Sequence, residues 1–99
     1  MQILLPVYDS SGKTFDRSLY RHVRQELLGK FGGLTTYSRA PAKGLWAEGD
    51  HEVVKDDIEV YEVMVPELDR RWWADYRTAL ESRFMQQELV VRALAAELL

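Results

Sequence analysis

Two kinds of hydrophobic periodicity alternate along this chain, and they limit its possible folds more than any other feature. Apolar residues recur every four positions between residues 15 and 31, which predicts an amphipathic helix over about 15–30. Thr14 is a suitable N-cap for this helix, and Gly32-Gly33 is expected to end it, because glycine readily adopts the left-handed conformation found at helix ends. The sequence therefore predicts one helix with an identifiable start and end.

A second helical stripe lies in the C-terminal half. Its apolar residues are spaced by three and four positions, and they are Leu68, Trp72, Trp73, Tyr76, Leu80 and Phe84. Pro66-Glu67 is expected to open this helix, because proline is tolerated in the first turn, and we expect it to end near Met85. Arg70-Arg71 precedes the tryptophan pair, and this mixture of cations and aromatics also occurs where proteins stack on single-stranded bases. Because the tryptophans share the apolar stripe, we predict core packing or a subunit interface instead.

The remaining apolar segments have a period of two and predict strands. Residues 3–8 and 57–65 are apolar on both faces, and Pro6 is expected to disturb regular pairing in the first of them. Residues 34–38 form a third strand, interrupted at 40–44 and resuming near 45–47. A short last strand begins near Glu88.

The predicted order is therefore strand, helix, split strand, strand, helix, strand, or βαββαβ. This order resembles a ferredoxin-like α+β fold, in which two right-handed crossovers place both helices on one face of an antiparallel sheet. With 99 residues and no linker or repeat, we expect a single domain over residues 1–99. The fold hosts too many functions to indicate one.

The composition excludes several classes of protein. The chain has no cysteine, which rules out disulfide frameworks, zinc ribbons, iron-sulfur clusters and thiol nucleophiles. No apolar run approaches the ~20 residues needed to cross a bilayer, and the first residues lack the basic start of a signal peptide. The formal net charge is −3, so a broad basic surface for nucleic acid is not expected. We expect a cytoplasmic protein with no membrane or nucleic-acid partner.

Several short motifs together resemble a group of small uncharacterised bacterial proteins. They are Phe31-Gly32-Gly33-Leu34-Thr35, Gly44-Leu45-Trp46, Asp57, the strand 60–65 and Gln87-Glu88 after the second helix. In that group a phenylalanine-glycine-glycine-x-threonine turn leads to glycine-x-tryptophan, and glutamine-glutamate begins the last strand. The resemblance implies the ferredoxin-like fold and no established activity.

The irregular stretch 38–44 is where we would look for a ligand. Arg39 offers a planar fork for a carboxylate or phosphate, and Trp46 and Tyr37 offer flat apolar surfaces. With His51 nearby, these four residues form the candidate ligand-binding cleft, and in an enzyme they would form the active site. No cofactor is expected.

Carboxylates suggest metal chemistry at two places. Residues 48–69 hold nine acids and one lysine, but neighbouring residues on a strand point to opposite faces, so we interpret them as a solvated edge and predict no metal site. Val7-Tyr8-Asp9 ends the first strand, and an aspartate there could hold a metal for phosphodiester hydrolysis. That layout loosely resembles the small CRISPR-associated endoribonucleases. An aspartate before Ser-Ser-Gly is more often a turn former, so the nuclease is an alternative.

Two helices can cover only one face of the predicted sheet. Leu4, Val60 and Met64 place apolar side chains on the second face as well, and such a face usually marks association. The leading interpretation is therefore a homodimer, formed by stacked sheet faces, with a binding or regulatory role and no catalysis. The alternatives are a small enzyme using the cleft defined above and the Asp9 nuclease.

Overall fold

The computed structural model describes residues 1–39, 43–45, 52–54 and 57–99. In chain order its elements are β1 (Gln2–Pro6), α1 (Arg17–Phe31), β2 (Thr35–Arg39), β3 (Lys43–Leu45), β4 (Glu52–Val54), β5 (Ile58–Glu62), α2 (Arg70–Arg83) and β6 (Val90–Arg92). The protein is thus α+β, as the two periodicities predicted.

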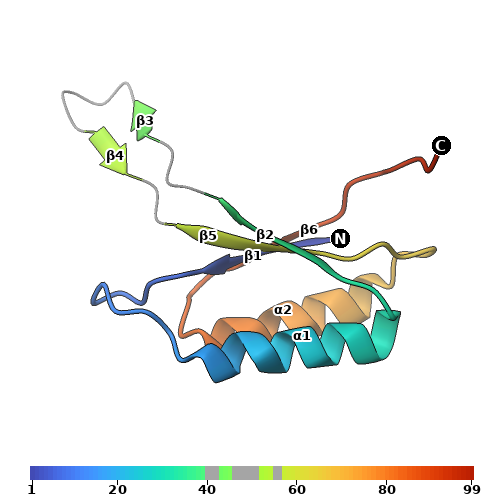
Figure 1. The fold of residues 1–99 in the computed structure, drawn as a ribbon, viewed down its shortest axis with the longest axis horizontal. Helices are drawn as coiled ribbons and strands as arrows, with labels where there is room; N and C mark the ends of the chain where they lie inside the picture. Colours follow the sequence, from blue (N-terminus) through green and yellow to red (C-terminus); the bar gives the residue numbers. More distant parts are fainter. Residues whose placement is uncertain (40–42, 46–51, 55–56) are drawn as a thin grey trace.

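Four strands form one antiparallel sheet in the order β2-β5-β1-β6. Both helices lie on the same face of this sheet (Figure 1), an arrangement compatible with a ferredoxin-like fold. The expected βαββαβ order needs one correction, because β3 and β4 pair with each other as a separate two-stranded ribbon between β2 and β5. Of the continuation predicted at 45–47, the described residues include only Leu45, which lies in β3 opposite Glu52 and does not extend the main sheet.

The first helix begins two residues later than its apolar stripe suggests. Asp16 is its N-cap, and the Asp16 carboxylate accepts a hydrogen bond from the Ser18 N–H at 2.8 Å. Thr14, the predicted cap, is instead held in an isolated bridge with Tyr8. At the other end the prediction is confirmed, because Gly32 adopts a left-handed φ of 78° and its N–H bonds to the Leu28 carbonyl.

The second helix begins later than predicted. Asp69 is its N-cap and accepts from the Trp72 N–H at 3.0 Å, so the helix starts at Arg70 and not at Pro66-Glu67. It ends at Arg83, close to the expected position. A capping carboxylate at Asp69 therefore outweighs the proline signal three residues earlier.

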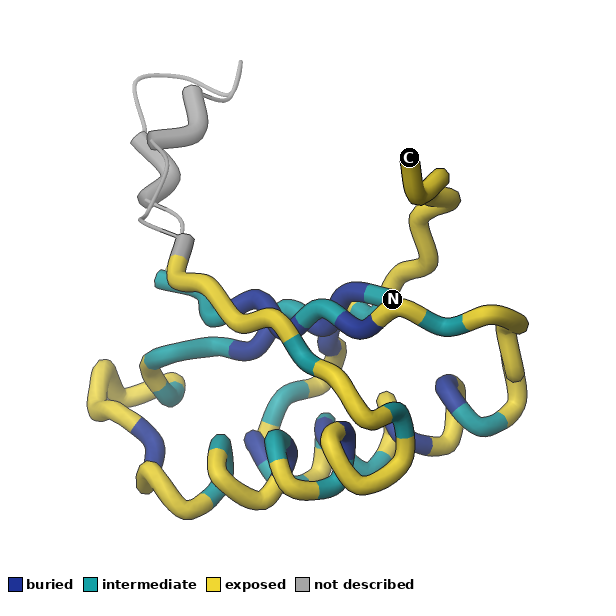
Figure 2. Tube along the Cα trace, turned by 45° about the vertical axis from the view of Figure 1, so that its right-hand side comes forward, coloured by how far each residue is buried: buried dark blue, intermediate teal, exposed yellow. Residues whose placement is uncertain are grey.

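The hydrophobic core lies between the sheet and the helix pair, where the buried residues concentrate (Figure 2). Its fully buried members include Ile3, Leu5, Val23, Leu27, Leu80 and Phe84. Trp73 is 4% exposed and stacks on Phe31 at 5.3 Å between ring centroids, so the prediction that the tryptophan pair packs in the core is confirmed for Trp73. Trp72 is partly buried and packs against the core edge.

The other face of the sheet, which neither helix covers, is called the open face below (Figure 1). The strand register places its side chains in rows. One row is polar and consists of Thr35, Glu62, Gln2 and Arg92, and the next is apolar and consists of Tyr37, Val60, Leu4 and Val90. No helix in the described part of the chain is long and apolar enough to cross a membrane.

Candidate functional site

The four residues predicted from the sequence to form a ligand site are described only in part. Tyr37 lies on β2, is 43% exposed, and its hydroxyl accepts a hydrogen bond from the Gln2 amide at 3.4 Å. The Arg39 backbone pairs with Ile58 at the end of β2. Trp46 and His51 lie outside the described residues, so their grouping with Tyr37 and Arg39 stays a prediction.

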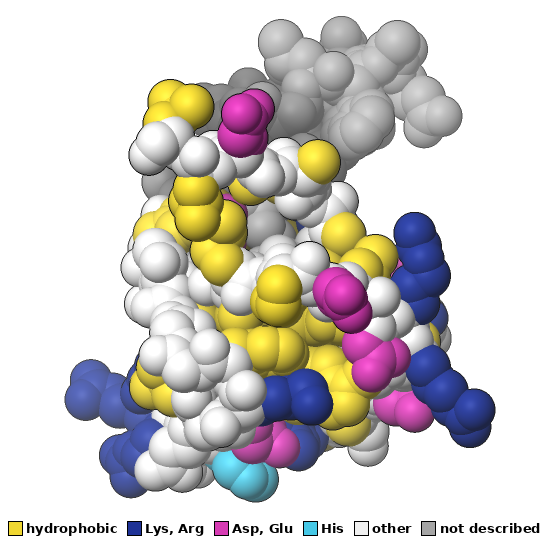
Figure 3. Space-filling view, turned by 90° about the vertical axis from the view of Figure 1, so that its right-hand side faces the viewer, with side chains coloured by type: hydrophobic (Ala, Val, Ile, Leu, Met, Phe, Trp, Pro, Cys, Tyr) yellow, Lys and Arg dark blue, Asp and Glu magenta, His cyan; other side chains and the backbone are white. Residues whose placement is uncertain are grey.

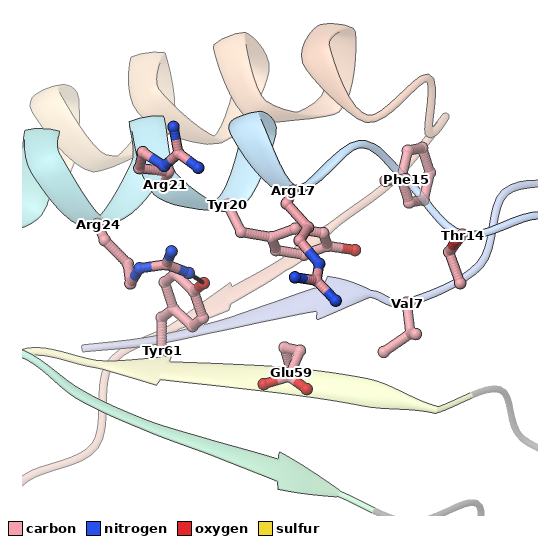
Figure 4. A pocket seen from close by; sticks show the side chains of 9 residues that line it. All are labelled: Val7, Thr14, Phe15, Arg17, Tyr20, Arg21, Arg24, Glu59 and Tyr61. Atoms are coloured by element: carbon pink, nitrogen blue, oxygen red, sulfur yellow. Dashed lines mark hydrogen bonds between the residues drawn. The ribbon is translucent and has the colours of Figure 1, made fainter.

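A different site is present on the helix side of the sheet, between α1 and β5. It is a cleft of about 610 Å³, shown in Figure 4, and it is called the arginine cleft below. Its lining residues are Val7, Thr14, Phe15, Arg17, Tyr20, Arg21, Arg24, Glu59 and Tyr61. Residues far apart in sequence therefore meet in one hollow.

Helix α1 positions the three basic side chains of this cleft. Arg17, Arg21 and Arg24 are spaced by four and three residues, which places them on neighbouring turns of one helix side. Figure 4 shows Arg17 and Arg24 reaching toward the sheet on either side of Tyr20, whereas Arg21 lies alongside the helix at the rim. The cleft therefore has two guanidinium groups directed inward and a third at its mouth.

Two tyrosines and one carboxylate form the rest of the polar lining. The Tyr20 hydroxyl donates to the Pro6 carbonyl, and burial raises the pKa of Tyr20 to about 12, helped by Tyr61 and Glu59. Burial also raises the pKa of Tyr61, although Arg24, which donates to the Tyr61 hydroxyl at 3.0 Å, opposes this shift. Glu59 faces the cleft from β5 and accepts from the Ser38 hydroxyl at 2.7 Å. Both phenols are thus neutral at physiological pH.

The electrostatics of the arginine cleft favour an anion. Three guanidinium groups against one carboxylate leave an excess of two positive charges in the lining, in a chain whose formal net charge is −3. Guanidinium groups donate in a rigid fork that matches carboxylate and phosphate oxygens. Among the described lining residues there is no imidazole and no pair of carboxylates for proton transfer. The guanidinium groups of this lining are suited to binding an anion.

Sequence reasoning missed this site. The apolar period predicts a helix over about 15–30, which contains Tyr20, but it does not single out Arg17, Arg21 or Arg24. One signal was available, because arginines at positions 17, 21 and 24 repeat with the helical period beside that stripe. Glu59 and Tyr61 carry no such signal, since only the packing of α1 over β5 brings them to the arginines.

Asp9, the residue of the nuclease alternative, forms a turn. One of its carboxylate oxygens accepts from the Ser11 N–H, the Ser11 hydroxyl and the Lys13 N–H at 2.8, 2.6 and 2.9 Å. The Ser11 hydroxyl is the main cause of the lowered pKa of Asp9. Within the described ranges no group of three or more His, Cys, Asp or Glu side chains is placed to hold a metal. The nuclease alternative therefore stays a prediction with no structural support.

A second hollow, of about 720 Å³, lies at the far end of the helix pair beside Phe31, Trp72 and the segment 64–69. Figure 3 shows this end, where hydrophobic side chains gather between basic and acidic ones. Its cation is already engaged, because the Lys30 ammonium lies 4.7 Å from the centroid of the Trp72 ring. The lining of the arginine cleft, by contrast, has an excess of two positive charges.

No family model, no curated protein and no solved structure matches this chain. The functional argument therefore rests on the geometry of the site.

Proposed function

We propose that this protein is a non-catalytic binding domain that holds a small anionic molecule in the arginine cleft. The observation that carries the proposal is the convergence of Arg17 and Arg24 on one cleft, with Arg21 at its rim. The ligand class is a small molecule with phosphate or carboxylate groups. A binding role was the leading interpretation of the sequence, and the cleft supplies a location and a chemistry for it.

The fold we propose for this role is the ferredoxin-like fold with an inserted ribbon. Without β3 and β4, the four strands of the main sheet would follow the ferredoxin-like order, with both helices on one face. Ligand sites are commonly built where a helix side and a sheet leave a hollow, because both elements hold their side chains rigidly. The site lies on regular structure, with α1 and β5 as its walls.

The neutral phenols and Glu59 give the cleft a preference beyond charge. The Tyr61 hydroxyl already accepts from Arg24, so its own proton remains available to donate to an anion. Glu59 repels anionic groups close to β5 and accepts hydrogen bonds from donors. A ligand with an anionic group toward α1 and a hydroxyl or amino group toward β5 would pair with the arginines and donate a hydrogen bond to Glu59.

The test is calorimetric titration of the whole protein with pyrophosphate and with citrate, using glycerol as the uncharged comparison. We expect heats of binding for the anions that weaken as salt is raised, because exposed charges are screened. Arg17→Gln and Arg24→Gln should each weaken binding at least about ten-fold, since each removes a charge-assisted pair.

The matched control is Arg71→Gln, which removes an exposed arginine on α2, outside the cleft. This variant should bind as the wild type does. Absence of binding by both anions would contradict the proposal. Equal weakening by Arg71→Gln would also contradict it, because the anions would then respond only to the general surface charge of the protein. Circular dichroism of each variant confirms that the fold is retained.

A further inference from the structure

The open face carries an ordered polar row with opposite charges on the two strands that flank β1. Gln2 on β1 is only 8% exposed, and its amide donates to the Glu62 carboxylate on β5 at 3.0 Å. On its other side Gln2 accepts from the Arg92 Nε on β6 at 2.8 Å. The Glu62 carboxylate therefore lies on the strand next to β1 on one side, and the Arg92 guanidinium lies on the strand next to β1 on the other side.

An apolar row runs parallel to this polar row. Leu4 on β1 lies opposite Val60 on β5 and Val90 on β6. Val90 is 48% exposed and Tyr37, at the β2 edge of the row, is 43% exposed, whereas Val60 between Leu4 and Tyr37 is 3% exposed. In both rows the residue of β1 lies between a residue of β5 and a residue of β6.

We propose that the open face binds a second copy of this chain about a two-fold axis that runs along β1. Such an axis exchanges the positions of β5 and β6, because each is the immediate neighbour of β1. Arg92 of each copy then lies opposite Glu62 of the other. Leu4 meets its own copy. The face is complementary to itself in charge and in apolar character.

The distances typical of stacked sheets suit these contacts. Sheets pack about 10 Å apart, a gap that an arginine and a glutamate side chain reach across together. Arg92 uses its Nε toward Gln2, and within the described part of the chain no other hydrogen bond of its guanidinium is present. Its remaining donors are therefore available to the second copy.

The surroundings of the open face suit a partner seated between two projections. Residues 93–99 leave β6 on the side away from the helices, and the β3–β4 ribbon projects on the same side (Figure 1). Leu94 in this C-terminal segment is 57% exposed, and Leu98 is 84% exposed. These apolar side chains extend the surface that a second copy would meet.

Charge reversal with complementation in a mixture tests the proposal. We expect the wild type to scatter light at twice the monomer mass of 11.5 kDa at micromolar concentration. Glu62→Arg alone and Arg92→Glu alone should each weaken self-association at least about ten-fold, because like charges then face each other across the axis. An equimolar mixture of the two variants should regain the dimer, since every positive charge again faces a negative one.

The matched controls reverse exposed charges away from the open face. Arg71→Glu and Glu67→Arg should leave self-association unchanged, and circular dichroism should show that all variants are folded. Recovery in the mixture cannot come from contacts within one copy. Glu62→Arg has positive charges at both positions 62 and 92, and Arg92→Glu has negative charges at both, so opposite charges meet only between the two variants.

Three outcomes would overturn the proposal: a monomeric wild type, reversals without effect, or a mixture that fails to recover. If the protein is a monomer that binds a hydrophobic dye only after residues 93–99 are removed, the chain's own C-terminal segment covers the open face. That result also contradicts the proposal. The anion titration does not depend on any of these outcomes. Failure of the dimer proposal therefore leaves the proposal of anion binding in the arginine cleft unchanged.

Discussion

The two faces of the sheet differ in how completely they are covered, although the same strands form both. On the helix side Ile3 and Leu5 are fully buried, and Val63 is 1% exposed. On the open face Val60 is 3% exposed, but Leu4 is only partly buried and Val90 is 48% exposed. The strand pattern alternates residue by residue, so side chains of nearly equal hydrophobicity have very different surroundings.

This difference teaches that apolar character alone does not determine burial in such a sheet. The helix side is stabilised by apolar packing, with aromatic pairs such as Phe15–Phe84 at 5.2 Å. The open face is organised by the hydrogen bonds of Gln2 in addition to apolar contact. One face acts as the core, and the other combines an apolar row with a row of polar groups.

The sharpest test of the comparison truncates two neighbouring leucines. Leu5→Ala should lower the free energy of unfolding by about 3 kcal/mol, because it leaves a cavity in a packed core. Leu4→Ala should cost about 1 kcal/mol at low protein concentration, since its surroundings are only partly closed. Urea unfolding followed by tryptophan fluorescence measures both. Equal losses would show that the open face is covered within a single chain.

A second test removes the middle of the polar row. Gln2→Ala should lower the free energy of unfolding by about 1 to 2 kcal/mol, because Glu62 and Arg92 lose their shared partner. Gln25→Ala, an exposed position on α1, is the control and should change it by less than about 0.5 kcal/mol. Thermal unfolding compares the two variants. Similar small effects would mean that the row contributes nothing to the order of the open face.

The smallest effect is expected at the polar contact that joins the two helices. Both Arg83 Nη groups donate to Glu26, and Tyr76 donates to the same carboxylate at 3.2 Å. Glu26→Gln should lower the free energy of unfolding by about 1 kcal/mol at pH 7, because the contact is partly open to water. Glu67→Gln, an exposed carboxylate before α2, is the matched control.

The same contact gives a pH dependence. The Arg83 guanidinium holds the pKa of Glu26 below its usual value of 4.5, so the folded state favours the ionised form. The stability from this carboxylate is therefore present above about pH 4.5 and is lost as pH falls through the lowered pKa. Acid titration of stability should be steeper for the wild type than for Glu26→Gln. Identical slopes would show that the helix contact is broken in solution.

Much of the secondary structure was predictable, and the errors share a cause. Both helices and all four strands of the main sheet were expected, because each depends on periodicity within one segment. The errors concern competition between segments. Thr14 was a reasonable cap until Tyr8 paired with it, and the end of the split strand paired as β3 with β4 instead of joining the main sheet.

The candidate site was much less predictable than the fold. The sequence directed attention to Tyr37, Arg39, Trp46 and His51, since aromatic and charged residues near an irregular stretch are common in ligand sites. The arginine cleft instead joins one helix side to β5, a strand more than thirty residues away in the chain. No local pattern encodes such a meeting.

The sequence by itself determined the local periods, the stop at Gly32, and the presence of strands apolar on both faces, because these follow from the backbone geometry of neighbouring residues. Only the tertiary structure decided which apolar face the helices cover and which residues meet across the arginine cleft. The physical reason is that both helices pack on the same side of the sheet, so Leu5 becomes core while adjacent Leu4 stays on the open face. The same packing brings the arginines of α1 over Glu59 and Tyr61.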